Sequence, residues 1–295
     1  MISPLAHVDP SAKIGENVTI HPFAYIDQNV EIGDGCEIMP YTSIIRGTRM
    51  GRNNKVYQGT IIGADPQDFR WKGEDTYCYI GDNNVIREHV IINRGIYSSG
   101  GTRIGDDCFI MAESHIGHDT VIQGKCVVGN SGLIAGDVEV EECTILSSCS
   151  ILHEKSKVGR WVLVKGGCRI NGNVPPFTIF AHNPVSYIGI NAVVMRKHGY
   201  TEEQIDDIAK CYRHVYQSGT SVFNAVGMRK HGYSEEQIDD VAKCYRHVYQ
   251  SGTSVFNALR RIEADVDDNE VRQEIIDFIS NNDMKIVALP IDTID

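Results

Sequence analysis

The chain has no long apolar run, no closely spaced cysteine pair and no excess of positive charge. No stretch approaches the roughly 18 to 20 apolar residues that a membrane-spanning helix needs, so we expect no membrane span. A formal net charge of −11 argues against nucleic acid as a partner. The first residues, MISPLAHVDPSAKIG, lack the basic and then apolar segments of a secretory leader, and we therefore expect a cytoplasmic protein.

The sequence does contain an apolar residue at every sixth position. From Val8 to Ile170, 25 of the 28 positions six residues apart are Ile, Val, Leu or Met. An α-helix has a period of 3.6 and a strand a period of 2, so neither gives this spacing. Six is the repeat of the hexapeptide β-helix, in which one apolar residue per hexad points to the axis and three hexads close one coil. We therefore predict a mainly β protein, a three-sided prism of short parallel strands.

A second column of mostly small residues lies two positions before each axial residue and fits the narrow interior of such a prism. Five of the nine cysteines fall in this column, where a reduced thiol packs as a small apolar group: Cys36, Cys78, Cys108, Cys126 and Cys168. No CxxC pair occurs, so we expect no structural metal and no cofactor. Glycine follows the axial residue at nine positions, among them Gly33 and Gly117, where we expect a permissive backbone to help the chain turn.

The three positions that break the period, Asp68, Glu74 and Ser98, mark two excursions from the prism. We predict loops from about residue 64 to 79 and from about residue 93 to 103 that return in register. Loops on a rigid scaffold often carry function, so the polar segment DPQDFR of the first loop is a candidate for substrate contacts.

The hexad register stops at Pro175 and Pro176, which divides the chain into a β-helix domain, residues 1–190, and a helical domain, residues 191–295. Thr201 and Gln204 form a capping box at the start of a predicted helix. Residues 191–223 and 224–256 are identical at 30 of 33 positions. Helical arrays need about three repeats or more, so we interpret this as a tandem duplication within one domain.

The densest polar cluster of the prism is the segment ESHIGHD, residues 113–119, whose two histidines flank an axial isoleucine and must point outward. A coil holds 18 residues, so Gly136 is expected above His118, and Glu154 above Gly136, each at a spacing of roughly 4.8 Å. An imidazole beneath an exposed backbone N–H is suited to acyl transfer, with Asp119 holding the imidazolium. An ordinary surface histidine is the alternative.

The HIGHD segment, the DPQDFR loop, the NVPPF exit and the NAVVMRKHGY helix entry resemble UDP-N-acetylglucosamine 3-O-acyltransferases, the enzymes that begin lipid A synthesis. The resemblance runs from residue 1 to about residue 226 and resumes after the repeat. It implies a left-handed coil, a homotrimer, acyl carrier protein as donor and UDP-N-acetylglucosamine as acceptor. It also implies His118 as the base on the sugar 3-hydroxyl, Asp119 as its orienter and the Gly136 N–H as oxyanion donor.

The resemblance further implies substrate contacts for residues of the first loop, the prism and the helical domain: Gln67, Asp68, Arg70, His115, Asp137, His153, Glu154, Asn191, Lys197 and His198. Some of these depart from the family pattern. Arg70 stands where the family often has Lys, Asp137 where it commonly has His, and Glu154 where Gln is frequent. Lys197 and His198 replace an Arg pair, which weakens bidentate phosphate recognition.

Gly166 matches a position that limits acyl length in relatives, where a bulky side chain shortens the chain accepted. The glycine predicts a long 3-hydroxyacyl group, although a glycine required by the turn is an equal alternative. Two other enzyme classes stay open. A γ-type carbonic anhydrase would bind interfacial zinc through His115, His118 and either His89 or His153. Another sugar N- or O-acyltransferase would use the same base with a different donor. A scaffold rod without activity is the weakest of the alternatives.

Overall fold

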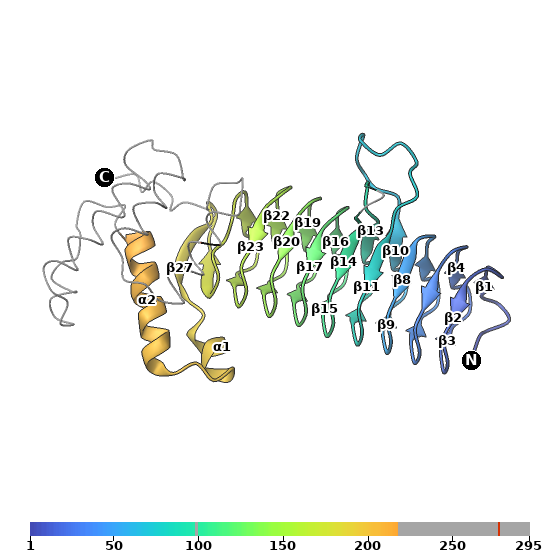
Figure 1. Ribbon diagram of the computed structural model, residues 1–295, viewed down its shortest axis with the longest axis horizontal. Helices are drawn as coiled ribbons and strands as arrows, with labels where there is room; N and C mark the ends of the chain where they lie inside the picture. Colours follow the sequence, from blue (N-terminus) through green and yellow to red (C-terminus); the bar gives the residue numbers. More distant parts are fainter. Residues whose placement is uncertain (98–99, 218–276, 278–295) are drawn as a thin grey trace, which may run out of the picture.

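The computed structural model describes residues 1–97, 100–217 and 277, with residues 210–217 described by their backbone alone. These residues form a three-sided prism, a left-handed parallel β-helix, with two helices at its C-terminal end (Figure 1). The six-residue period arises because each hexad supplies one short strand and one corner. The fold class predicted from that period is confirmed.

The strands stack into three sheets. The first sheet contains β1 His7–Val8, β4 Tyr25–Ile26, β7 Ser43–Ile44, β10 Ile61–Ala64, β13 Ile91–Asn93, β16 His115–Ile116, β19 Leu133–Ile134, β22 Ile151–Leu152 and β25 Arg169–Ile170. The second contains β2 Lys13–Ile14, β5 Glu31–Ile32, β8 Thr48–Met50, β11 Cys78–Ile80, β14 Thr102–Ile104, β17 Val121–Ile122, β20 Glu139–Val140 and β23 Lys157–Val158. The third contains β3 Thr19–Ile20, β6 Glu37–Ile38, β9 Lys55–Val56, β12 Val85–Ile86, β15 Phe109–Ile110, β18 Val127–Val128, β21 Ile145–Leu146, β24 Leu163–Val164, β26 Thr178–Ala181 and β27 Ser186–Ile190.

Three edges separate these sheets, and we number them in the order in which the chain passes them within one coil. The first edge runs from the first sheet to the second and includes residues 117–120, 135–138 and 153–156. The second edge runs from the second sheet to the third, and the third edge closes the coil by returning to the first sheet. His115 pairs with Leu133 and Leu133 with Ile151, so successive coils are in register at 18 residues.

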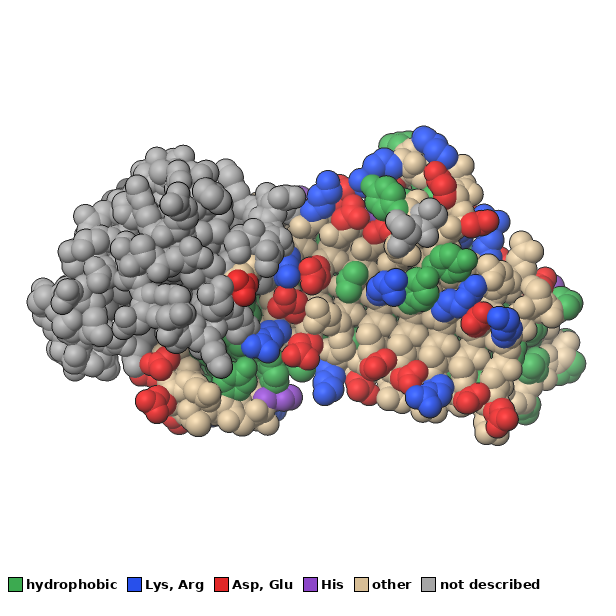
Figure 2. Space-filling view, in the orientation of Figure 1, with side chains coloured by type: hydrophobic (Ala, Val, Ile, Leu, Met, Phe, Trp, Pro, Cys, Tyr) green, Lys and Arg blue, Asp and Glu red, His purple; other side chains and the backbone are tan. Residues whose placement is uncertain are grey.

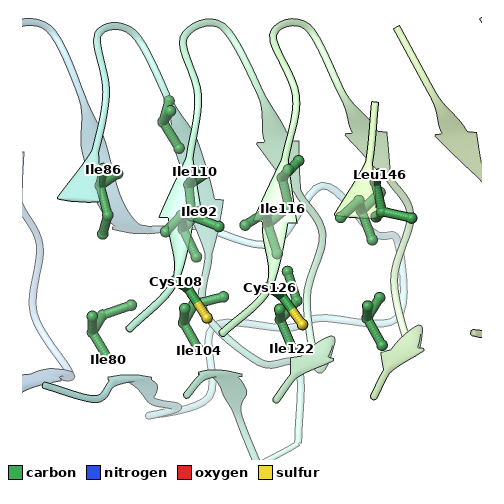
Figure 3. Packing of buried hydrophobic residues seen from close by; sticks show 14 of the residues in the cluster. Ile80, Ile86, Ile92, Ile104, Cys108, Ile110, Ile116, Ile122, Cys126 and Leu146 are labelled. Carbon is green, nitrogen blue, oxygen red and sulfur yellow. The ribbon is translucent and has the colours of Figure 1, made fainter. Parts of the chain in front are cut away.

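The interior holds the axial residues in continuous rows. Figure 3 shows isoleucines of successive coils inside the prism, with Cys108 and Cys126 beside them. Ile86 and Ile110 are fully buried, and burying such a side chain stabilises the fold by about 1.5–3 kcal/mol. All five cysteines predicted for the small inward column are buried and free, as expected.

The glycines that follow axial residues serve a purpose different from the predicted one. The left-handed corner position comes three residues after the axial residue. Non-glycine residues such as Asn17 (φ 56°) and Asp119 (φ 54°) occupy it. A Cβ at Gly33 would lie 2.7 Å from the carbonyl of Gly51, and one at Gly117 would lie 2.7 Å from the Gly136 nitrogen. Gly33 and Gly117 are therefore needed because successive coils approach closely, whereas Gly63 (φ 79°) uses the predicted freedom of its backbone.

The helices lie against the last coils. Helix α1, Ala192–Lys197, leads to α2, Glu202–Gln217, which packs on β27 (Figure 1). The predicted capping box is present, because Thr201 N–H donates to Gln204 Oε1 (2.9 Å) and Gln204 N–H to Thr201 Oγ1 (3.2 Å). The second repeat copy, residues 224–256, lies outside the described residues. No helix within the described part of the chain is long and apolar enough to cross a membrane.

Candidate active site

Both excursions from the prism leave from the first edge. The first loop, residues 65–77, joins β10 to β11 and projects from the prism in Figure 1; the second loop, residues 94–101, joins β13 to β14. Each replaces a corner between the first and second sheets, at the same edge as His118. The structure therefore gathers both loops and His118 on a single edge.

His118 lies beneath Gly136 and beside Asp119. Its Nδ1 is 3.1 Å from Asp119 Oδ2, and the two side chains are only 8% and 10% exposed. A Cβ added at Gly136 would lie 2.3 Å from His118 Nε2 and 2.4 Å from Cε1. The ring thus packs directly against the glycine of the next coil, and only glycine fits there.

The Gly136 N–H has no hydrogen-bond acceptor among the described residues. Its neighbours are bonded, since Ala135 N–H donates to Leu152 O (3.0 Å) and Asp137 N–H to His118 O (2.9 Å). Within residues 1–97 and 100–217, the Gly136 N–H donates no hydrogen bond. An unused backbone donor beside an imidazole is the equipment that stabilises an oxyanion during acyl transfer.

Asp119 is held by the second loop. The Ile96 N–H donates to Asp119 Oδ2 at 2.8 Å, the oxygen that also faces His118 Nδ1. This arrangement favours a proton on Nδ1, which leaves the Nε2 lone pair to accept another. His118 therefore presents Nε2 as the ring nitrogen that is able to accept a proton.

The first loop brings an arginine and an aspartate to the same place. Asp68 Oδ2 lies 3.4 Å from His118 Nε2, and Arg70 binds both carboxylate oxygens of Asp68 at 2.8 and 2.9 Å. Arg70 Nη2 also donates to Glu154 Oε1 at 2.8 Å and lies 3.8 Å from Asp137 Oδ2. In Figure 2, acidic and basic side chains lie side by side at the foot of the projecting loop.

These charges shift the ionisation of the cluster. The hydrogen bond with Asp119, together with the negative charges of Asp137 and Asp68, raises the pKa of His118 despite its burial. Burial raises the pKa of Asp137. The hydrogen bonds from Arg70 to Asp68 hold the pKa of Asp68 well below the usual range. Asp68 is therefore a permanent carboxylate near neutral pH, and His118 binds a proton more readily than a free histidine.

Arg94 is a positioning residue that the sequence reasoning missed. Its side chain is 1% exposed; Nη1 donates to Gly63 O at 3.1 Å, Nη2 lies 2.5 Å from Asp65 Oδ1, and the guanidinium lies over the Trp71 ring. It therefore anchors the base of the first loop from the start of the second. The available signal was an arginine that directly follows the apolar run IIN as the hexad register breaks.

Three other predicted contacts surround the cluster. Gln67 is exposed on the first loop and forms no hydrogen bond with another described residue. His115 lies on β16, where burial lowers its pKa. His153 is exposed on the first edge, next to Glu154.

Gly166 lies on the third edge and is not held by a turn requirement. A Cβ there would meet only Ser148 O, at 3.1 Å, and the left-handed corner is taken by Gly167 (φ 75°). The alternative explanation, a glycine required by the turn, therefore applies to Gly167. A Cβ at position 166 would therefore make one tight contact, with a backbone oxygen, and would not need a left-handed backbone.

The predicted contacts of the helical domain lie near the second edge. Asn191 is buried, and its Nδ2 donates to the carbonyl oxygen of Trp161 at 3.0 Å. The His198 ring packs edge-on against Trp161, with ring centres 3.9 Å apart, and Lys197 is exposed. Trp161 is a corner residue of the second edge. The structure therefore does not bring these three residues together with His118 within one chain.

The donor atoms of His118, Asp119 and Asp137 lie within 4.8 Å of one another, and this is the one group of potential metal ligands among the described residues. It contains a single imidazole, and Arg70 already supplies positive charge 3.8 Å from Asp137. A γ-type carbonic anhydrase binds zinc through three imidazoles, so the donor set does not fit that class.

Fold and site together define a hexapeptide-repeat acyltransferase. The chain is 41% identical over 223 residues to the acyl-(acyl-carrier-protein)–UDP-N-acetylglucosamine O-acyltransferase of Stutzerimonas stutzeri, which covers 75% of this chain and 86% of that relative. It belongs to the UDP-N-acetylglucosamine O-acyltransferase family.

Solved structures and a family model agree. A UDP-N-acetylglucosamine acyltransferase from Bacteroides fragilis is 39% identical, with a TM-score of 0.73 over 97% of this chain and 99% of that chain. The enzyme from Francisella novicida is 28% identical, with a TM-score of 0.77 over 98% and 95%. The family model described as UDP-N-acetylglucosamine O-acyltransferase, domain 2, matches twice, at residues 173–225 and 221–287. Each match contains one copy of the repeated 33-residue unit.

Proposed function

We propose that the protein transfers a 3-hydroxyacyl group from acyl carrier protein to the 3-hydroxyl of UDP-N-acetylglucosamine, the first step of lipid A synthesis. The 41% identical relative is named for the same donor and acceptor. One observation carries the proposal: the imidazole of His118, held at Nδ1 by Asp119, lies under a free Gly136 N–H. We expect the protein to act in the cytoplasm, where both substrates occur.

The chemistry follows from this arrangement. His118 Nε2 takes the proton of the sugar hydroxyl as that oxygen attacks the thioester carbonyl. The tetrahedral oxyanion accepts a hydrogen bond from the Gly136 N–H, while Asp119 stabilises the imidazolium. The attack has already formed the ester C–O bond, and collapse of the intermediate restores the carbonyl and breaks the C–S bond. The departing thiolate of the carrier protein then takes the proton back from His118.

The distribution of residues over the three edges supports a homotrimer. His118 and the two loops lie on the first edge, Gly166 on the third, and Lys197 with His198 near the second. One substrate cannot touch three edges of one prism, whereas prisms packed side by side join edges of different chains. We propose that the site lies between subunits, where neighbouring walls also form an apolar groove for the acyl chain.

Subunit mixing tests the trimer. Chains carrying His118→Ala and chains carrying Lys197→Glu are each expected to be poorly active alone. Co-expressed, they assemble some interfaces with both residues intact, so activity should exceed the sum of the two separate variants. Activity equal to that sum contradicts a site shared between chains.

We further propose a long acyl substrate, because Gly166 leaves its edge open. Gly166→Met is expected to shift the preferred donor toward shorter 3-hydroxyacyl carrier proteins, measured by kcat/KM across a chain-length series. Lys165→Met, at the adjacent exposed position, is the control. An unchanged donor preference in Gly166→Met refutes the proposal that position 166 limits acyl length.

The central experiment measures turnover of UDP-N-acetylglucosamine with 3-hydroxyacyl carrier protein. Loss of a general base lowers kcat by about 10²- to 10⁴-fold, so His118→Ala should fall in that range with an unchanged melting temperature. His7→Ala, on β1 far along the prism from the site, should keep full activity. Retained activity in His118→Ala refutes the assigned mechanism, and acetyl-CoA as the better donor identifies a different acyltransferase.

A further inference from the structure

The tip of the first loop, residues 67–74, reaches the prism mainly through one guanidinium. Arg70 Nη2 donates to Asp68 Oδ2 within the loop and to Glu154 Oε1 on the first edge, both at 2.8 Å. Glu154 belongs to the coil two turns beyond His118, 84 residues away from Arg70 in sequence. One side chain thus bridges a loop, a distant coil and the carboxylate that faces the base.

The remaining hydrogen bonds of the loop tip are internal. Lys72 Nζ donates to Phe69 O at 2.6 Å and Trp71 Nε1 to Glu74 O at 3.3 Å, while the Phe69 side chain is 99% exposed. Among the described residues, Arg70–Glu154 is the only hydrogen bond from residues 67–74 to the prism. Without this bond, the tip contacts the described part of the prism only through the ion pairs of Arg70 with Asp137 and of Asp68 with His118. Trp71 also packs on Arg94.

The charges make the same residue necessary. Three carboxylates, Asp68, Asp137 and Glu154, lie within 4 Å of Arg70 Nη2. Carboxylates this close repel one another unless a cation lies between them. Arg70 supplies that cation, and its planar fork binds two partners at once, which a lysine cannot do in the same way. The Glu154 carboxylate is thereby paired with a cation.

We propose that Glu154 is a positioning residue: it acts through Arg70 to fix the first loop so that Asp68 faces His118 Nε2. This inference rests on the proposed function, and it differs from a direct contact between Glu154 and the nucleotide. Asp68 lies 3.4 Å from the nitrogen that must receive the sugar hydroxyl, so the loop sets one wall of the sugar site. A loosened loop weakens binding and orientation of the sugar nucleotide and leaves the base itself intact.

A double-mutant cycle on the full-length protein tests this route. Glu154→Ala is expected to raise KM for UDP-N-acetylglucosamine by about tenfold with a much smaller change in kcat. In an Arg70→Ala background the same change should have less than about a twofold effect, because the route is already broken. Glu154→Gln keeps an acceptor oxygen and should restore most of the loss. Glu142→Ala is the matched control, since Glu142 is 50% exposed and Glu154 47%.

A second measurement needs no substrate. The chain has two tryptophans, so a Trp161→Phe background leaves Trp71 of the first loop as the sole reporter. Glu154→Ala should increase quenching of Trp71 fluorescence by acrylamide, and Glu142→Ala should not.

The outcomes separate the two proposals. If Glu154→Ala raises KM equally in the Arg70→Ala background, Glu154 contacts the substrate directly. If the Glu154→Ala and Glu142→Ala variants have the same KM and the same Trp71 quenching, Glu154 has no positioning role. Either result overturns the inference. If Glu154→Ala alters Trp71 quenching but the wild-type protein does not turn over the substrate, the loop contact is retained and the proposed function is refuted.

Discussion

The first and second edges of the prism use the same corner geometry for different ends. On the second edge, Asp82 Oδ1 accepts the N–H of Arg52 at 2.7 Å, and Asp106 Oδ1 accepts the N–H of Asp82 at 2.7 Å. The corresponding N–H on the first edge is that of Gly136, and the residue above it is Glu154, whose carboxylate is turned to Arg70. The N–H that is capped at Arg52 and Asp82 has no acceptor at Gly136 among the described residues.

Ionisation follows this difference. The N–H and guanidinium of Arg52 lower the pKa of Asp82, whereas burial raises the pKa of Asp137 on the first edge. On the second edge, carboxylates cap this N–H at Glu16, Arg52 and Asp82. The first edge leaves a donor and a base unsatisfied. We propose that the reaction uses this uncapped N–H beside His118.

Filling the space above His118 should have the largest effect. Gly136→Ala places a Cβ 2.3 Å from His118 Nε2 and pushes the ring away from Asp119. We expect kcat to fall by about 10²- to 10⁴-fold, the range for a lost general base. Gly124→Ala is the second-edge control, because its Cβ would meet only the Asp106 backbone, at 3.2 Å or more. Equal activity in the two variants would contradict the comparison of the edges.

Restoring the cap should be nearly as damaging. Glu154→Asp supplies the shorter carboxylate that Asp82 uses on the second edge, within reach of the Gly136 N–H. We expect kcat to fall by about 10²- to 10³-fold, as for a lost oxyanion donor, and by more than in Glu154→Gln. A Glu154→Asp protein with the kcat of Glu154→Gln would show that the donor is not used.

The pH at which kcat/KM falls on the acid side (the acid limb) should depend on the carboxylates around His118. A base works only when unprotonated, and the pKa of His118 is raised by Asp119, Asp137 and Asp68, so kcat/KM should fall as pH drops through a value above 6.5. Asp137→Asn removes one of these charges. The limb should therefore move to lower pH, giving a severalfold higher relative activity near pH 6. A limb that stays in place would exclude Asp137 from the electrostatics of the base.

The second edge should respond in stability alone. Asp82→Ala removes the acceptor of the Arg52 N–H and an ion pair that is partly exposed. We expect a loss of about 1–2 kcal/mol in the free energy of unfolding, measured in urea, with kcat and KM unchanged. A marked fall in kcat would mean that the two edges are not independent.

Sequence patterning reached the prism because its contacts are periodic. A six-residue step and an 18-residue coil determine which side chains point outward, and that reasoning put Gly136 above His118. The loops have no period, so Asp68 at His118 Nε2 and Arg70 at Glu154 were not predicted as contacts. The role of the glycines was misjudged because close approach of coils, unlike a turn, leaves no separate sequence signal.

The register of the coils also bears on how such an enzyme can change by descent. A corner residue stacks on the corners before and after it, so a substitution acts mainly along its own edge. His118 and Gly166 lie on different edges of one chain. Under the proposed roles of these two residues, mutation at Gly166 changes the wall of the acyl groove and leaves His118 undisturbed, which makes acyl preference and catalytic competence separately heritable traits.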